Sequence, residues 1–427
     1  MLSSSPTALT KPQTFDSCTI QLTSPMLHIG SEMQRLSPFE YVATPKFVYQ
    51  PNAEVLARSL YKRGRLPDYL YAIQERQSIL PILKQVFGDD WFQVQDEDGQ
   101  PIFPKVTRSL CWTDHRRISD LRPMIRNGFG QLYIPGSSIK GAIRTAIAYH
   151  LLKHRDRYSV PPAVRVSEIE NKLRKTMGNL RQKAKFADDS LFMDELFTNF
   201  ELLPALTNCK QGPNTDFMRA IQVTDTEPLL EERLEQKGRA IAVNLPIVAE
   251  VMISSRFQDY QAKYRASLFV EMVRNAKTQF TISIDSEMLS WFRHRNGMTL
   301  PFQSVQDILN ICQEFAQDQW DFEHDYWAEL KDNSRAAGTN LNFSEIRRIY
   351  EPETCPFSLR LGWGTGMNGT TIGLLLDDQL RSQLRDTCGI KAPDFEAPKS
   401  RRTIINQKGE VKFVSGWANF KVLSTAV

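Results

Sequence analysis

The sequence predicts an α+β fold, because segments with two different hydrophobic patterns are interspersed along a chain of 427 residues. Apolar and polar residues alternate over 15–24 and 279–285, which is typical of half-buried strands. Apolar residues recur at helical spacing over 53–93, and 303–332 also has the pattern of a helix. A chain of this length can form two or three domains.

Composition excludes several classes of protein. Hydrophobic residues make up 41% and charged residues 24% of the chain, which indicates a globular protein. The net charge is only +4, so any nucleic-acid site must come from local clustering of basic residues. The six cysteines form no C-x-x-C pair, and no apolar stretch reaches the length of a membrane span. We therefore expect a soluble cytoplasmic protein with reduced thiols, no cofactor and no membrane partner, with a loose tail over residues 1–13.

The first strand is expected over 15–24, with Cys18, Ile20 and Leu22 on one face and an end at Pro25. The further elements are expected, in chain order, as helices over 53–93, strands at 106–112 and 132–134, a helix at 188–197, and strands at 217–225, 240–254, 279–285, 357–361 and 411–422.

The Pro135-Gly136 turn is followed by a predicted helix that Ser137 and Ser138 open. Either serine hydroxyl can accept a hydrogen bond from an amide of the first helical turn. Apolar residues then recur at spacing four, which predicts a buried helix face that consists of Ile139, Ile143 and Ile147.

Two cations lie on another face of the same helix, Lys140 and Arg144, one turn apart. Helix-start amides and two nearby cations suit a phosphate group. The whole segment 140–185 carries 12 Lys/Arg against three acids, which indicates either an RNA-backbone contact or a solvated helix face. Segment 303–332 has eight acids and one base, so it is either an exposed helix or a surface for a neighbouring subunit.

A glycine-rich loop, 362–369, follows the strand predicted at 357–361. Glycine permits positive φ, and successive amides of such a loop can bind an anion. The loop also contains G-x-G-x-x-G, but no helix pattern opens directly from it, which argues against a dinucleotide site. The remaining alternative is a tight loop that only supports a neighbouring strand.

The Pro-Gly-Ser-Ser-x-Lys-Gly stretch at 135–141, with Arg144 after it, resembles the signature of RAMP proteins, the RNA-binding subunits of CRISPR effector complexes. His28-Ile-Gly-Ser31 also resembles a RAMP segment, although Glu32 replaces its final glycine. The other similar segments are Leu36–Val42, the Arg-x-x-x-Val-x-Asp strand that ends at Asp225, the glycine loop with Arg360, and the closing Gly416-Trp417. Their order is most similar to the subfamily that caps type III-A (Csm) complexes.

This resemblance implies two ferredoxin-like (RRM-like) RAMP domains with helical insertions. The first would span 14–230 with its insertion near 53–93. The second would span 231–427 with its insertion near 286–335 and the glycine-rich loop 362–369. The resemblance also implies a non-catalytic subunit that binds the 3′ part of the guide RNA (crRNA), caps the backbone filament and supports maturation of the guide 3′ end. Its partners would be the backbone filament subunit, the small subunit and a recruited host nuclease.

The segments similar to RAMP proteins supply the predicted RNA-binding residues, and no catalytic or metal-binding residue is expected among them. The set consists of His28, Gly30, Ser31, Gly136, Ser137, Ser138, Lys140, Arg144, Arg360, Gly362, Trp363, Gly364, Thr365 and Gly366. Contacts of this kind would meet phosphates and carry no base specificity, which suits a subunit that serves guides of any sequence.

Three alternatives stay open. His28 could act as the general base of a guide-processing endoribonuclease, although no partner acid is found in its motif. His150 and His154 lie one helical turn apart and could bind a metal, although the glutamate of H-E-x-x-H is absent, and solvated or RNA-facing histidines are favoured. The chain could also be a sibling RAMP subunit of a related type III complex.

Overall fold

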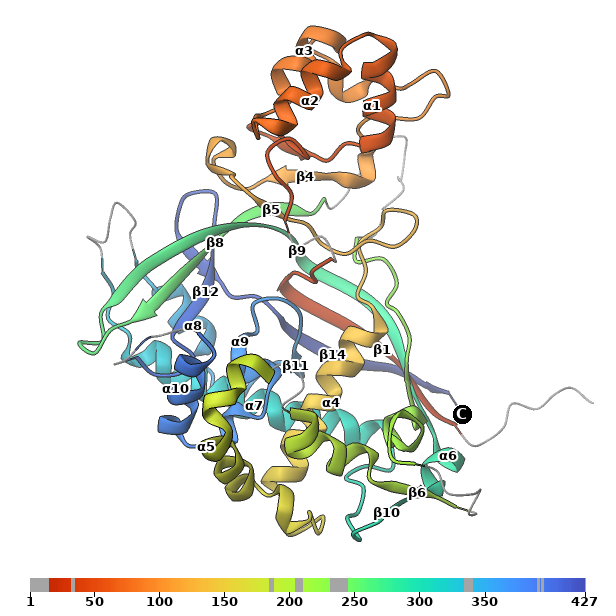
Figure 1. The fold of residues 1–427 in the computed structure, drawn as a ribbon, viewed down its shortest axis with the longest axis vertical. Coiled ribbons are helices and arrows are strands. Elements are labelled where there is room, and N and C mark those ends of the chain that lie inside the picture. The colour runs from red at the N-terminus through yellow and green to blue at the C-terminus, as the bar shows by residue number, and fades with distance from the viewer. Residues whose placement is uncertain are drawn as a thin grey trace, which may run out of the picture.

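The computed structural model describes residues 15–31, 35–183, 188–203, 210–230, 245–333, 341–389, 392 and 395–426. The predicted N-terminal tail, the first part of the strand predicted at 240–254 and the predicted domain boundary at 230/231 therefore lie outside or at the edge of the described residues. The fold is a mixed α and β structure with one large sheet (Figure 1).

The strands are β1 (Phe15–Leu27), β2 (Val42–Ala43), β3 (Phe47–Tyr49), β4 (Arg108–Cys111), β5 (Leu121–Arg122), β6 (Phe200–Leu202), β7 (Ile221–Val223), β8 (Ile247–Arg256), β9 (Ala262–Asp285), β10 (Phe292–His294), β11 (Leu359–Arg360), β12 (Ser400–Ile405), β13 (Val411–Phe413) and β14 (Trp417–Ala426). The helices are α1 (Ala53–Lys62), α2 (Leu66–Gln74), α3 (Leu80–Phe87), α4 (Gly136–Lys153), α5 (Val166–Lys183), α6 (Ser286–Trp291), α7 (Val305–Glu329), α8 (Ser344–Tyr350), α9 (Gly366–Thr370) and α10 (Asp378–Thr387). Among the described helices, none is long and apolar enough to cross a membrane.

The 12-stranded sheet runs in the order β11-β14-β1-β9-β8-β4-β3-β2, and β12 continues it from β8. β1 pairs antiparallel with β9 on one side and with β14 on the other. The alternation predicted for β1 is confirmed, since Cys18, Ile20 and Leu22 are buried in the main core. The sheet therefore places an N-terminal strand between two strands from the second half of the chain.

The predicted end of β1 at Pro25 is wrong, because the strand continues to Leu27. Proline lacks an amide donor, so a break in pairing was expected there. The partner strand stays in the same register past the proline, and only the pair between Pro25 and Asn275 is skipped, where Asn275 has a φ of 48°. Pairing resumes one residue later, between Met26 and Arg274.

Helices α1, α2 and α3 form a lobe of their own beyond β4, at the top of Figure 1. Their apolar faces pack on a separate cluster of buried residues that includes Leu56, Leu60, Leu83 and Trp91. The helices predicted over 53–93 are thus confirmed, and they have a core that is separate from the main one.

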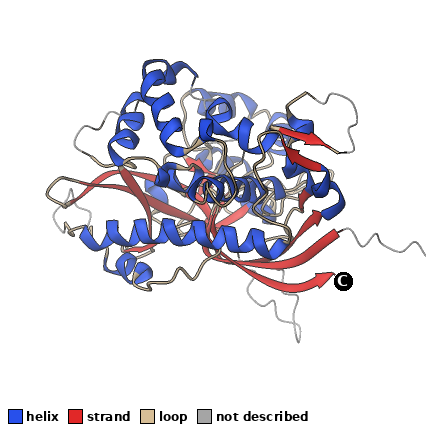
Figure 2. Cartoon of the chain, turned by 90° about the horizontal axis from the view of Figure 1, so that it is seen from below, coloured by secondary structure: helices blue, strands red, loops and turns tan. Residues whose placement is uncertain are grey.

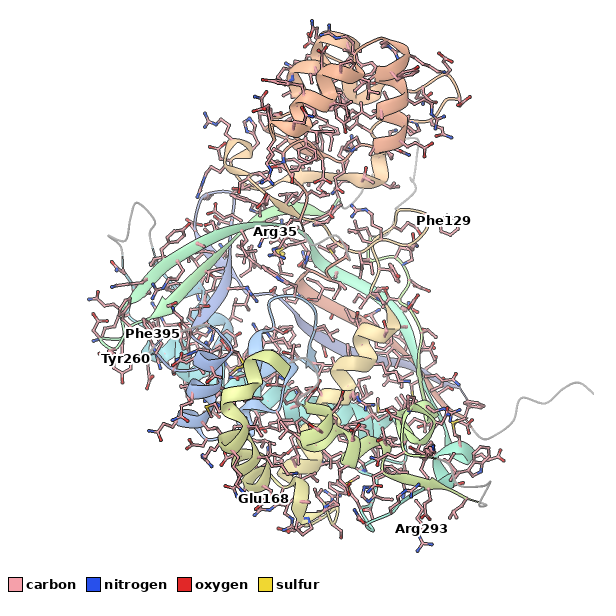
Figure 3. The ribbon with its side chains drawn as sticks, viewed as in Figure 1. Arg35, Phe129, Glu168, Tyr260, Arg293 and Phe395 are labelled. Carbon is pink, nitrogen blue, oxygen red and sulfur yellow. The ribbon has the colours of Figure 1, made fainter. Side chains whose placement is uncertain are left out.

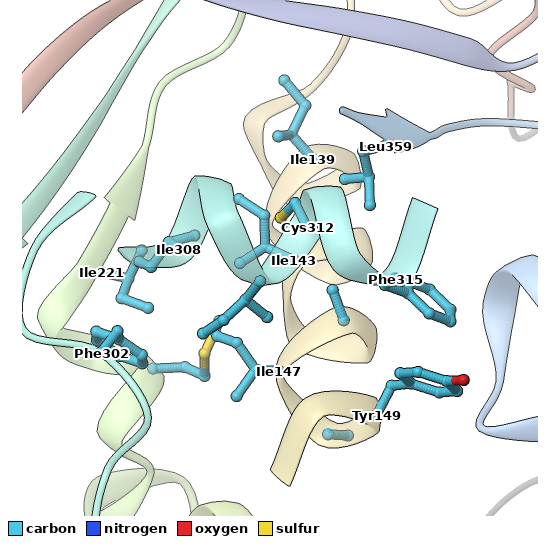
Figure 4. Close-up of a cluster of buried hydrophobic side chains, with 14 of the residues drawn as sticks. Ile139, Ile143, Ile147, Tyr149, Ile221, Phe302, Ile308, Cys312, Phe315 and Leu359 are labelled. Carbon is cyan, nitrogen blue, oxygen red and sulfur yellow. The ribbon is translucent and has the colours of Figure 1, made fainter. Parts of the chain in front are cut away.

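The main core lies between the sheet and the helices α4 and α7. Ile139, Ile143 and Ile147 of α4 are fully buried, as predicted, and meet Cys312 and Phe315 of α7 (Figure 4). Seen from below, the helices lie in front of the strands, which they partly cover (Figure 2).

Four other expected strands differ from the structure. The strand predicted at 217–225 is reduced to β7, because Phe217–Ala220 form a short 3-10 helix. The strand predicted at 132–134 reduces to a single bridge between Leu132 and Arg126, because the chain there runs straight into α4. The segment 279–285 is only the end of the 24-residue strand β9. The closing strand is divided into β13 and β14, because the backbone turns at Gly416, where φ is 93°.

Candidate nucleic-acid interface

The start of α4 is held by an internal acceptor. Pro135 occupies the N-cap position, and no side chain caps the helix from there. The amide N–H of Gly136 donates to Oδ1 of Asp225, at 2.7 Å. Ser137 and Ser138 are exposed and do not cap the helix, so the predicted capping role of these serines is wrong.

Gly136 and Lys140 attach α4 to β7. A Cβ atom on Gly136 would lie 2.2 Å from the carbonyl oxygen of Val223, so only glycine permits this approach. Nζ of Lys140 donates to the carbonyl oxygen of Ile221 at 2.8 Å, and burial lowers the pKa of this lysine. These contacts give a physical reason why the Pro-Gly-Ser-Ser-x-Lys-Gly stretch and the Arg-x-x-x-Val-x-Asp strand occur in the same chain.

Arg144 also has an internal partner. Its guanidinium donates to Oδ2 of Asp216 at 2.6 Å and lies over the ring of Phe197, at 4.0 Å. The two cations predicted to meet phosphates are thus already engaged within the fold. Their RNA-binding role stays a prediction that this geometry does not favour.

The basic and acidic segments meet each other within the chain. Lys153 of α4 contacts Glu314 at 3.0 Å and Asp318 at 2.5 Å, both on α7. Nδ1 of His150 and Nε2 of His154 also lie against Glu314. The expectation that these histidines face solvent or RNA is therefore wrong. Part of the charge expected to meet RNA or a neighbouring subunit holds two helices together instead.

His28 lies inside the protein, with 2% of its surface exposed. Its Nδ1 lies 2.7 Å from the carbonyl oxygen of Glu271, which can only accept, so Nδ1 carries the proton. Burial lowers the pKa of His28 to about 4. The neighbouring Gly30 is exposed and bridges to Met124, and Ser31 is half-buried.

The glycine loop after β11 meets the His28 segment. Gly362, Gly364 and Gly366 have φ values of 76°, 101° and 76°, as expected for a loop that requires glycine. A Cβ atom on Gly362 would lie 2.3 Å from the carbonyl oxygen of His28. That oxygen also accepts a hydrogen bond from the amide of Trp363, at 2.9 Å. Two of the three predicted segments are therefore joined directly.

Two arginines that are not in the predicted set lie against the half-buried ring of Trp363. The guanidinium carbon of Arg402 lies 4.6 Å from the ring centroid, and that of Arg122 lies 5.4 Å away. Within the described residues, neither guanidinium makes a hydrogen bond or an ion pair. Burial lowers the pKa of Arg402, and the positive charges of Arg122 and Arg360 lower it further. The carboxylate of Asp120 acts in the opposite direction on Arg122, without a direct ion pair. Cations that lack a direct carboxylate partner suit an anion.

A buried ion pair is formed four residues after Arg122. Arg126 donates to both oxygens of Glu271, at 2.8 and 2.7 Å, and Glu271 is fully buried on β9. This pair attaches the segment after β5 to the sheet. Arg35, labelled near β5 and β9 in Figure 3, also lowers the pKa of Arg122, after the larger effect of burial.

A cavity of about 200 Å³ lies against the glycine loop. Arg401 and Arg402 line it, together with Gly364, Thr365 and Asn368. Asn368 is 5% exposed, and neither atom of its amide has a hydrogen-bond partner in the described structure.

Two loop residues from the predicted set have internal partners. Arg360 is 7% exposed, donates to the carbonyl of Ser415 and lies over Trp417, so it supports the loop from inside. Thr365 donates to the carbonyl of Gly362, at 3.1 Å.

A second tryptophan and arginine pair lies on the same sheet. Arg274 lies 4.2 Å from the ring centroid of Trp112, beside a cavity of about 580 Å³ that Lys46 also lines. Trp112 and Trp363 both pack against one apolar cluster, which contains Val270 and Ile404 among its members. The basic and aromatic residues thus follow one apolar strip of the sheet.

No spacing in the sequence could have identified Arg122, Arg402, Trp112 or Arg274. They lie on four different segments that only the sheet brings together. The one available signal is the type of residue, since tryptophan and arginine are the side chains that stack on bases and pair with phosphates.

The structure can be compared with known proteins. Residues 19–342 match the family model of the RAMP superfamily. The Csm5 protein of the CRISPR system of Enterococcus italicus is 26% identical over 162 residues, which cover 32% of this chain and 46% of that protein. The chain thus matches less than half the length of this curated relative.

Two solved structures have a similar fold. One is a chain in a cryo-EM structure of a Csm-crRNA-target RNA ternary complex of a type III-A CRISPR-Cas system, with a TM-score of 0.58 and 23% identity over 95% of this chain and 100% of that one. The other is the crystal structure of Csm5 from T. onnurineus, with a TM-score of 0.55 and 18% identity over 94% of this chain and 100% of that one. At these identities the two structures show a common fold. Because the family model matches more than half of its residues, the chain belongs to the RAMP superfamily.

Proposed function

We propose that this chain is the RNA-binding subunit that caps the backbone filament of a type III-A CRISPR (Csm) effector complex, in the position of the fifth Csm subunit. Membership of the RAMP superfamily and the likeness to Csm5 proteins support the assignment. The observation that carries it is the position of two guanidiniums, those of Arg122 and Arg402, on the ring of Trp363, where neither has an ion-pair partner in the described part of the chain.

The proposed mechanism is capture of the guide backbone, in its 3′ part, along the apolar strip of the sheet. Arg122 and Arg402 would donate to successive phosphates, whose charge offsets the repulsion between the two cations. Arg274 and Lys46 would extend this path at the other cavity. Contacts to phosphates alone read no bases, so guides of any sequence can bind.

The glycine loop has a positioning role in this proposal. Gly362 allows the loop to pack against the His28 carbonyl, and the Trp363 amide fixes the ring there. Gly364 and Gly366 leave the backbone open toward the cavity beside Arg402. The exposed residues Gly30, Ser137 and Ser138, half-buried Ser31, and the α4 cations stay in the proposed interface as secondary contacts.

The proposed subunit is non-catalytic, and its part in maturation of the guide 3′ end is to hold RNA for a recruited nuclease. Its protein partners are the backbone filament subunit and the small subunit. Against the ribonuclease alternative, His28 is buried and uses Nδ1 for the Glu271 carbonyl, so it has no free access to a ribose hydroxyl.

RNA binding by one double variant and one control variant tests this function. In Arg122→Ala with Arg402→Ala, we expect the affinity for a single-stranded guide RNA to fall at least about tenfold, and the salt slope to shrink by roughly 1.4, as for the loss of two phosphate contacts. Arg348→Ala is the control, because Arg348 is exposed and pairs with Glu345. An unchanged slope in the double variant would contradict the proposal, and cleavage of the RNA by the purified chain would favour the nuclease alternative.

We also propose that the continuous sheet is built from two ferredoxin-like units divided near residue 230. The antiparallel pairing of β1 with β9 and of β8 with β9 is compatible with such units, although strands of both halves share the sheet. Separate expression of 14–230 and 231–427 tests this division, since independent units would each fold cooperatively.

A further inference from the structure

Three side chains of the kinds that bind transition metals meet where α4 packs on α7. They are His150 and His154 of α4 and Glu314 of α7, and their ligand atoms all lie within 4.8 Å of one another. The histidines are four residues apart, so helical geometry brings both to one face. The sequence showed this pair but not the third residue, which lies 160 positions further along the chain.

The ligand atoms converge on one point. One oxygen of Glu314 faces Nδ1 of His150, and the other lies 2.7 Å from Nε2 of His154. The two imidazole centroids are 4.6 Å apart. Zinc binds imidazole nitrogen and carboxylate oxygen at about 2.0 to 2.2 Å, so small side-chain shifts would seat an ion between the three atoms.

His150 has the second partner that metal-binding histidines usually have. Its Nε2 lies 2.9 Å from the hydroxyl of Tyr158, which leaves Nδ1 directed at Glu314. A partner of this type fixes the ring orientation and the tautomer. His150 is 8% exposed, so these partners hold its ring inside the protein.

Lys153 is the competitor for this position. Its ammonium contacts Glu314, but it also contacts Asp318, and Asp318 accepts a further bond from the hydroxyl of Tyr149. An ion at Glu314 would therefore leave Lys153 paired with Asp318. Around this position the two carboxylates of Glu314 and Asp318 outnumber the one ammonium of Lys153.

We propose that His150, His154 and Glu314 form a binding site for a divalent transition-metal ion of the zinc class, which joins α4 to α7. The three protein ligands leave a fourth position for water. The ion would stabilise the helical layer behind the sheet. The proposal is independent of RNA binding, because the site shares no residue with the Arg122, Trp363 and Arg402 group.

Zinc titration of the full chain, freed of metal with a chelator, tests the site. We expect one zinc ion per chain by calorimetry and a zinc-dependent rise in the melting temperature. In His150→Ala with His154→Ala, zinc affinity should fall at least about a hundredfold, with no zinc-dependent rise. The matched control is His115→Ala with His324→Ala, which removes two other histidines from separate elements and should leave both results unchanged.

Two single variants separate a metal site from an ion-pair network. Glu314→Gln keeps the size of the side chain and should weaken zinc binding at least about tenfold, since it removes the anionic ligand. Lys153→Met removes the competing ammonium and should strengthen zinc binding. Absence of saturable binding in the wild type, or equal zinc affinity in the histidine pair and the control pair, would overturn the proposal.

Discussion

The start of α4 and the glycine loop after β11 contain similar residues but differ in how their donors are used. Both combine glycines with nearby cations, and both were expected to bind phosphate. At α4, the Gly136 amide, Lys140 and Arg144 all donate to acceptors of the fold. Beside the loop, Arg122 and Arg402 have no such acceptor among the described residues. A cation therefore indicates an anion site only where the fold supplies no acceptor for it.

The largest effect is expected for Gly136→Ala, which tests whether the α4 signature is structural. The new Cβ would meet the Val223 carbonyl, so we expect a loss of about 4 kcal/mol in the free energy of unfolding, measured with urea. Gly141→Ala is the control, because nothing lies within 4 Å of its Cβ position and alanine favours the helix. Equal stability of the two variants would remove the structural explanation.

The pH dependence of stability tests the burial of His28, against which the glycine loop packs. The pKa of His28 is lowered from 6.5 to about 4, so the unfolded chain binds this proton more readily. The contribution of neutral His28 to the free energy of unfolding is fully present above about pH 6.5. It is lost as the pH falls toward 4, by up to about 3 kcal/mol. In urea unfolding at several pH values, His28→Gln should lose this part of the slope, whereas a matching change at exposed His324 should keep it.

Lys140→Ala with Arg144→Ala should separate folding from RNA binding. Loss of the bonds to Ile221 and Asp216 should lower stability by about 2 kcal/mol. RNA affinity should change less than about threefold, in contrast to the expected effect at Arg122 and Arg402. A tenfold loss of affinity with unchanged stability would restore α4 as a primary phosphate site.

The smallest effect is expected for Asp225→Ala, which removes the acceptor of the Gly136 amide. Loss of a side-chain acceptor at a helix start costs about 1 kcal/mol, and Asp225→Asn should recover most of it. Thermal unfolding measures this difference. The same variant frees the helix-start amide, so a large rise in RNA affinity would show that Asp225 masks a phosphate site, and the contrast between the two segments would disappear.

Much of the local structure could be predicted from residue patterns. The alternation in β1, the helices of the insertion and the isoleucine face of α4 follow from periods of two and about 3.6 residues, which burial imposes on neighbours in the chain. The glycines at 362–366 were correctly expected to have positive φ, which restricts the choice of residue, but the short helix α9 that opens at Gly366 was not expected. The end of β1 was misplaced, because pairing with β9 continues in the same register on both sides of Pro25, which the local sequence does not show.

The sequence by itself determined the superfamily, the α+β character and the segments that carry its signature. Only the tertiary structure decided which donors remain available for a ligand. Asp216 and Asp225 come from far beyond α4 in the chain, and β5 and β12 bring Arg122 and Arg402 to one ring. Hydrogen bonds and ion pairs act between atoms a few ångströms apart, so they depend on distances in space that residue order along the chain does not specify.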